Sequence, residues 1–298
     1  MTGQQYDVDS IHVEPAAEPL PAGVGIQAGA FLLELSLDWI VLRASENVYQ
    51  LLGKSHVTLI EEPLGRFVQS DALHDLRNLF SRLSGTTGIA RAYRVRLTDE
   101  PDLVDVAFHV SDGRVVLEAV PSTDETVGAA LGSVGGLIAG LSDTTGRELL
   151  DAGARRMRAL TGYDRVTLLV GRSKATSSRS GVPFRPDANA SLSSGVPALV
   201  SNSAMAPVAL FPRGDGETAI GAALLRAPSP EEAAELTERG FAATMRVPVI
   251  RDEKRVGEFR LAHTTPRRPS FELHAAAELF AQLFAMQLEI DRLKAAAA

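Results

Sequence analysis

The sequence of 298 residues contains no cysteine. This absence excludes disulfides, cysteine-ligated zinc, a thiol nucleophile and thioether attachment of a cofactor to this chain. Long hydrophobic runs are also missing, since none reaches the roughly 20 residues of a membrane-spanning helix. The first 20 residues lack the basic and then apolar order of a signal peptide. We therefore expect a cytoplasmic protein with no membrane partner.

Positive charge is in short supply, with 30 lysine and arginine residues against 37 aspartate and glutamate residues. A net charge of −7 offers no broad electrostatic surface for nucleic acid or an anionic membrane. The hydrophobic share of 45% and the charged share of 22% are ordinary for folded proteins. The length suits two domains, each with its own core. The composition predicts a two-domain globular protein without a nucleic-acid partner.

Motifs of catalysis are absent as well. The sequence has no Gly-x-Gly-x-x-Gly after a strand, no complete Gly-x-x-x-x-Gly-Lys-Ser phosphate loop, no His-Glu-x-x-His and no Gly-x-Ser-x-Gly. The six histidines show no metal-ligand spacing. We expect His74 and His274 to be solvated on helices and His109 to be packed in a strand. The sequence thus predicts neither an enzyme nor a metal site in this segment.

The first domain is predicted between residues 29 and 122, after an N-terminal arm of residues 1–28 that is rich in Pro, Glu and Ala. Short apolar and alternating runs indicate strands, and periodic runs indicate helices. The strands are expected at 31–35, 39–44, 91–97, 104–110 and 114–120, and the helices at 45–53 and 72–83. Ser45 is the expected N-cap of the first helix. This pattern predicts an antiparallel sheet with flanking helices, an α+β fold of the sensor type.

The second domain is predicted over residues 129–298 and repeats the α+β class. Helices are expected at 129–141, 147–160, 230–240 and 269–294, and strands at 164–170, 243–250 and 255–263. Residues 171–195 are rich in Ser and Gly and are expected to form a long loop.

The last predicted helix carries a heptad pattern. Its apolar side chains recur at spacings of four, three, four and three, which is typical of a helix that pairs with another helix. Leu279 and Leu283 could equally cover the sheet, whereas Ile290 and Leu293 lie beyond it and indicate a partner helix. The full seam consists of Leu279, Leu283, Met286, Ile290 and Leu293.

Several segments resemble, in the right order, the PAS-GAF module of bacterial phytochromes, the biliverdin-binding photosensors that usually drive a histidine kinase. The resemblance implies a PAS domain, a GAF domain and an N-terminal arm threaded through a GAF loop in a figure-of-eight knot. The matching segments are IHV (11–13), IQAGAFLLEL (26–35), WIVLRASENVYQLLG (39–53), YDRV (163–166), APVALFP (206–212), LLRAPSPEEAAELTERGFAATM (224–245) and LAHTTPRRPSFELHAAAELFAQLFAMQLE (261–289).

The residues that hold the bilin in that family are mostly replaced here. The anchoring cysteine falls on Tyr6, and no Asp-Ile-Pro tripeptide exists in residues 171–195. The pocket histidines and aromatic residues fall on Glu232, Ala262, Leu169 and Glu235. Three positions keep a compatible residue: Thr244, His263 and Arg226. Of these, Arg226 matches an arginine that binds a propionate of the bilin in that family.

The resemblance and these replacements together predict a module without a cofactor. We expect a non-photosensory, dimeric input domain for a downstream output, which in this family is usually a histidine kinase. One alternative is a photoreceptor that holds biliverdin non-covalently through Arg226, Thr244 and His263. Another is a GAF site for a different small ligand, with Arg179 and Arg185 binding an acid.

Overall fold

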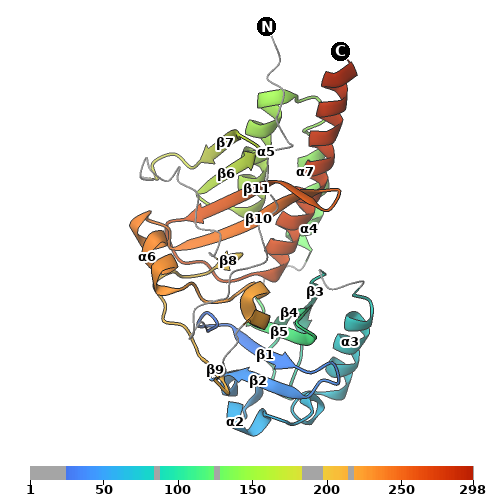
Figure 1. The fold of residues 1–298 in the computed structure, drawn as a ribbon, viewed down its shortest axis with the longest axis vertical. Coiled ribbons are helices and arrows are strands. Elements are labelled where there is room, and N and C mark those ends of the chain that lie inside the picture. Colours follow the sequence, from blue (N-terminus) through green and yellow to red (C-terminus); the bar gives the residue numbers. More distant parts are fainter. Residues whose placement is uncertain (1–24, 84–87, 124–127, 183–196, 214–217, 298) are drawn as a thin grey trace.

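The computed structural model describes residues 25–83, 88–123, 128–182, 197–213 and 218–297. The chain forms two antiparallel sheets, one in each half of the molecule (Figure 1). The strand order is β3-β4-β5-β1-β2-β9 in the first sheet and β7-β6-β11-β10-β8 in the second. Helices flank both sheets, which confirms the predicted α+β class with two domains in tandem.

The first sheet is built from strands that the sequence predicts to within a few residues. They are β1 (Phe31–Leu35), β2 (Val41–Ser45), β3 (Ala90–Val95), β4 (Val104–Ser111) and β5 (Arg114–Pro121). One face packs on α1 (Tyr49–Leu52), α2 (His56–Leu59), the 3₁₀ helix η1 (Leu64–Arg66) and α3 (Ser70–Ser81). Trp39 anchors this core through edge contacts with Phe80 and Phe108.

The predicted helix at 45–53 is wrong at its start. Ser45 ends strand β2, and its hydroxyl accepts a hydrogen bond from the Leu32 amide instead of capping a helix. The helix begins only at Tyr49, because residues 44 and 45 pair with the second domain through β9 (Leu210–Phe211). Gly53 ends the helix in the left-handed conformation, as predicted.

The second sheet consists of β6 (Arg165–Val170), β7 (Ser173–Ser178), β8 (Leu199–Val200), β10 (Ala243–Arg251) and β11 (Lys254–His263). Helices α4 (Ala129–Ala139), α5 (Gly146–Thr161) and α7 (Phe271–Ala297) pack together, and α5 and α7 cover one face of this sheet. There the rings of Phe259, Phe280 and Phe284 meet. The short 3₁₀ helix η2 (Thr218–Ala222) and helix α6 (Pro230–Glu238) lie between β9 and β10 in the chain.

Strand β7 corrects the expectation of a loop that begins at residue 171. Residues 173–178 pair with β6 along their whole length. The sequence conceals this strand because it lies at the edge of the sheet and is built of Ser, Thr, Lys and Ala, with only Ala175 and Ser177 buried. Residues 183–195 of the predicted loop lie outside the described residues.

The two domains share a hydrophobic core. The second face of the first sheet contributes Leu32, Val116 and Val120 to the same cluster that contains Phe271 and Phe280 of α7. An interface of this kind favours one rigid body over two independently moving domains. Among the described residues, no helix is both long and apolar enough to cross a membrane.

Residues 25–27 connect the N-terminal arm to the second domain. Ile26 exchanges hydrogen bonds with Val208 at 2.9 and 2.8 Å, and the Gln27 amide donates to the Leu225 carbonyl at 3.0 Å. The chain therefore passes between two segments of the stretch that separates β8 from α6. Residues 1–24 lie outside the described residues, and the figure-of-eight knot stays a prediction.

Candidate functional site

The second sheet has a face opposite α5 and α7, here called the outer face. Side chains alternate along a strand, and Met245 and Val247 of β10 point into the core with α7. Their neighbours therefore belong to the outer face. It carries Arg165, Thr167 and Leu169 of β6, Thr244, Arg246 and Pro248 of β10, and Glu258, Arg260 and Ala262 of β11. Leu236 of α6 packs with Val200 and Ala262, so α6 covers one end of this face.

Arg226, the predicted anion-binding arginine, is 3% exposed and already faces a carboxylate of this chain. Its guanidinium pairs with Glu232, with Nη2 and Oε1 3.3 Å apart, and donates to the Ala227 carbonyl at 3.0 Å. Glu232 is held in place by a capping box at the start of α6. Its Oε2 accepts from the Ser229 amide at 2.7 Å, while the Ser229 hydroxyl accepts from the Glu232 amide.

A second ion-pair network lies across the middle of the outer face. Glu258 accepts from Arg246 at 3.0 Å, from Arg255 at 2.5 Å and from Arg260. Burial alone would raise the pKa of Glu258, but the three guanidinium groups outweigh burial and hold this pKa below its usual value. A buried carboxylate with several charge-assisted partners is costly to disrupt, because removing one side leaves an uncompensated charge.

Thr244 and His263 are not brought together. Thr244 is fully buried beside Ala262, and its hydroxyl has no hydrogen-bond partner among the described residues. His263 follows Ala262 and so points to the other side of β11, where Nδ1 lies 3.5 Å from an Asp164 oxygen. Its ring also packs edge-on against Tyr163.

The remaining predicted positions divide into three groups. Glu235 pairs with Arg239 within α6 at 2.7 Å, and Leu169 is partly buried on β6. Arg179, proposed to bind an acid, pairs with Asp164 at 3.1 Å. Tyr6 and Arg185 lie outside the described residues. No cluster of three or more His, Asp or Glu side chains that could hold a metal ion occurs in the described part of the chain.

The expectation for His274 is wrong. His109 is buried in β4, as predicted, and burial lowers its pKa; His74 is exposed. His274, however, is buried where α7 meets the first domain, with Nδ1 3.1 Å from Arg91 of β3. Burial lowers the pKa of His274 to about 4. The sequence of α7 alone could not reveal this environment, because Arg91 is 183 residues away.

Sequence reasoning also missed Arg246, Glu258 and Arg260. A usable signal was present, since each is a charged residue at alternate positions of strands that are otherwise apolar. Charges in such positions are either solvated or paired with one another. Arg246 and Arg260 are register partners on neighbouring antiparallel strands, so their pairing with Glu258 could have been predicted.

The heptad seam of α7 is largely exposed. Leu279, Met286, Ile290 and Leu293 are 37%, 63%, 44% and 54% exposed, whereas Leu283 is partly buried against the core. The two interpretations, covering the sheet and pairing with a partner helix, therefore apply to different residues of the seam. Leu283 covers the domain's own core, and the other four present an apolar stripe along the helix.

Comparison with known proteins supports both domains. Residues 16–122 match the family model of the PAS fold, and residues 146–291 match that of the GAF domain. A bacteriophytochrome of Pseudomonas aeruginosa is 26% identical over 89% of this chain. The chain spans only 39% of that relative's length.

Solved structures share the fold at lower identity. The chromophore-binding domain of an unusual bacteriophytochrome from R. palustris has a TM-score of 0.73 and 23% identity, with 91% of this chain and 96% of that chain covered. The photosensory core module of Stigmatella aurantiaca phytochrome has a TM-score of 0.75 and 21% identity, with 97% of this chain and 61% of that chain covered. The two domain matches, the curated relative and the shared fold together identify this chain as a PAS-GAF module of the bacteriophytochrome family.

Proposed function

We propose that this sensory module has lost bilin binding and acts as a dimeric, non-photosensory input domain for a downstream output, such as a histidine kinase. No catalytic step is assigned to this segment. The observation that carries the proposal is the Arg226–Glu232 pair, because a carboxylate of the chain already pairs with the arginine to which the resemblance assigns an acidic group of the ligand.

The residues on the outer face do not fit a tetrapyrrole with two propionates. An incoming carboxylate near Arg226 would meet Glu232, and like charges at close range repel strongly in a partly buried site. Elsewhere on the outer face, three arginines already form ion pairs with Glu258. No cysteine is available to form a thioether that would offset this cost.

The second candidate is a photoreceptor that holds biliverdin without a covalent bond. One observation favours it, the fully buried Thr244 hydroxyl without a hydrogen-bond partner among the described residues. A buried unpaired hydroxyl costs about 1–3 kcal/mol, and a ligand could satisfy it. The position of His263 argues against this candidate, because His263 lies on the opposite face of the sheet from Thr244.

A spectrum separates the two candidates. We expect purified protein incubated with biliverdin to give the spectrum of free pigment and to release all pigment on denaturation. A red-shifted band with red/far-red photoconversion would overturn the proposal. The variant Glu232→Gln keeps a side chain able to cap α6 but removes the negative charge beside Arg226. It should bind biliverdin measurably better than the parent chain if Glu232 is the obstacle.

Dimerisation along α7 is the second part of the proposal. Leu279, Met286, Ile290 and Leu293 form an apolar stripe on a helix of 27 residues, and pairing with the same stripe of a second copy would bury it. Large apolar side chains in such a row are costly to leave in water.

The double variant Met286→Glu/Ile290→Glu is expected to convert the dimer to a monomer, because it places four carboxylates in the helix pair. Analytical ultracentrifugation measures the change, and thermal unfolding verifies that the variant is folded. Ala159→Glu, an exposed position on α5, is the control and should leave the dimer intact. A parent chain that is monomeric at all accessible concentrations would contradict this part of the proposal.

A further inference from the structure

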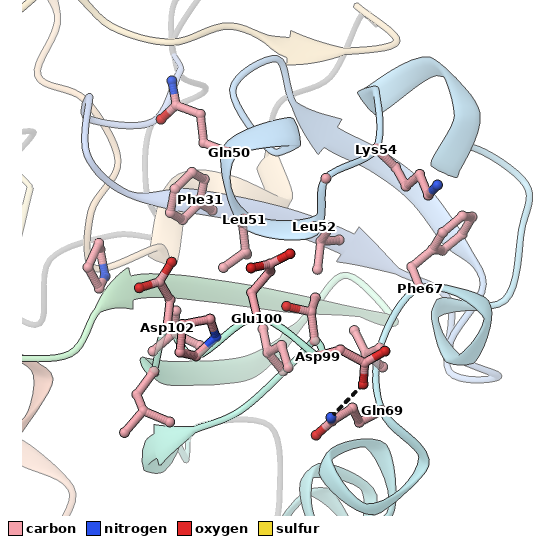
Figure 2. Close-up of a pocket in the computed structure, with 18 of the residues that line it drawn as sticks. Phe31, Gln50, Leu51, Leu52, Lys54, Phe67, Gln69, Asp99, Glu100 and Asp102 are labelled. Carbon is pink, nitrogen blue, oxygen red and sulfur yellow. Dashed lines mark hydrogen bonds between the residues drawn. The ribbon is translucent and has the colours of Figure 1, made fainter.

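The PAS domain contains a groove that is separate from the outer face of the second sheet, the sheet of the GAF domain. Its volume is about 1060 Å³. Figure 2 shows it between α1, the segment that leads into α3, and the loop that joins β3 to β4. All of its lining residues belong to the first domain.

The floor of the groove is apolar and rigid. It is formed by side chains of the PAS core that are nearly buried but still reach the groove: Phe31, Leu52, Val68, Leu97 and Val104. Each belongs to the same hydrophobic cluster as Trp39 and Phe108. A pre-formed apolar floor favours a ligand with an apolar body, because such a body removes the floor from water without reorganising the core.

One wall of the groove is acidic. Asp99, Glu100 and Asp102 all lie in the loop between β3 and β4, and their carboxylates are drawn toward the groove in Figure 2. Asp99 accepts a hydrogen bond from Gln69 at 3.0 Å. The side chains of Glu100 and Asp102 have no ion pair or hydrogen bond within the described part of the chain.

The three cations that line the groove form no ion pair with this wall within the described part of the chain. Arg66 pairs with Glu62, and Arg94 donates to the Thr123 carbonyl at 3.2 Å. Lys54 lies at the end of α1, on the opposite wall (Figure 2). The carboxylates of Asp99, Glu100 and Asp102 therefore make the potential negative on the loop side of the groove, beside the apolar floor, while Lys54 carries a positive charge on the opposite wall.

We propose that this groove is a ligand site of the module for a small organic cation with an apolar body. The apolar part covers Phe31, Leu52 and Leu97, and the ammonium or guanidinium group pairs with Glu100 and Asp102. An anionic ligand of the same shape is repelled by the loop. A site in the PAS domain gives the module a chemical input that is independent of the GAF face.

The test uses two probes with the same apolar body and opposite charge, phenethylamine and 3-phenylpropionate. We expect the amine to bind at least about tenfold more tightly and to shift the backbone amide NMR signals of residues 49–54 and 97–104. The affinity should fall as salt is added, because the pairing groups are exposed to solvent. Equal binding of both probes, no binding of the amine in excess, or shifts confined to other regions would overturn the proposal.

A charge variant with a matched control completes the test. Glu100→Gln/Asp102→Asn keeps the shape of both side chains and should weaken the amine about tenfold, the effect of losing two partly exposed ion pairs. Glu238→Gln/Asp143→Asn removes the same charge from exposed positions of the GAF domain and should leave binding unchanged. Unchanged binding in the first variant would refute the assigned role of the acidic wall. Thermal unfolding of both variants separates lost binding from lost folding.

Discussion

Replacing Gly25 by alanine is expected to destabilise the protein by about 3 kcal/mol, the upper range for overpacking a tightly filled site. A Cβ atom at this position would lie 2.0 Å from the Val208 carbonyl oxygen, far inside van der Waals contact. The obstacle is the backbone of Val208 and Ala209, which cannot rotate away as a side chain can. The arm and the GAF segment must therefore separate.

The damage is expected in the GAF domain, although Gly25 precedes the PAS domain. Separation strains the two hydrogen bonds between Ile26 and Val208 and the bond from the Ala227 amide to the Gly25 carbonyl. It also displaces Gln27, whose side chain donates to the Leu199 carbonyl at 2.6 Å and accepts from the Ser201 amide at 2.7 Å. Leu199 is the first residue of β8, one of the two edge strands of the GAF sheet, and Ser201 follows that strand.

Urea unfolding gives the loss of stability, and hydrogen exchange locates it. We expect faster exchange at the amides of Ile26, Val208 and Ala227 in Gly25→Ala, because these amides donate the hydrogen bonds between the arm and the GAF segment. The control is Gly132→Ala on α4, where a Cβ atom meets nothing within 4 Å and alanine is the better helix former. Stability equal to the parent chain in Gly25→Ala would mean that the arm is not fixed at this position.

The sequence was sufficient for the elements that carry strong local patterns. Strands β4 and β5, with their Asp112-Gly113 turn, and helix α7 were predicted within a few residues. Elements whose pairing is decided by distant residues were not. Strands β8 and β9 have two residues each and exist only because β10 and β2 lie beside them. Strand β7 lacks an apolar alternation because it is an edge strand.

The sequence shows which bilin-binding residues are missing from the candidate site, but it does not show which contacts the residues in their place make. A missing cysteine and the carboxylate at Glu232 are visible in the sequence. The pairing of Glu232 with Arg226 depends on the turn that brings α6 back over the end of β8. The surroundings of Arg246 and His274 depend on neighbouring strands and on the PAS domain. Local spacing contains no information on such contacts.

The buried carboxylate of Glu118 is expected to make the stability of the module depend on pH. Glu118 lies on β5 with 0% exposure and crosses to the GAF domain, where its two oxygens accept from the Leu224 and Leu225 amides at 2.8 and 2.7 Å. Burial raises its pKa from 4.5 to about 7, while the two amides and Arg91 oppose the rise. The contact between the domains thus contains a group that titrates near neutrality.

The sign follows from the proton that the folded state retains. A carboxyl whose pKa is higher in the folded chain binds its proton more tightly there, so its contribution is complete below the unfolded pKa of 4.5 and is lost as pH rises through 7. This rise in the pKa of Glu118 corresponds to about 3 kcal/mol, since each pKa unit is worth about 1.36 kcal/mol. Other carboxylates of the module change stability in the opposite direction, so a difference measurement is needed.

That difference is between the parent chain and Glu118→Gln in urea unfolding from pH 4.5 to 8. Glutamine cannot titrate, and its amide group faces a backbone donor, which adds a constant cost of about 1–3 kcal/mol. The parent should therefore exceed the variant most at pH 4.5, and the gap should shrink by about 3 kcal/mol toward pH 8. Glu100→Gln, which changes an exposed carboxylate, should track the parent at every pH. A gap that does not change with pH would mean that the Leu224 and Leu225 amides, with Arg91, keep Glu118 ionised throughout, and that proton uptake plays no part in holding the PAS domain to the GAF domain.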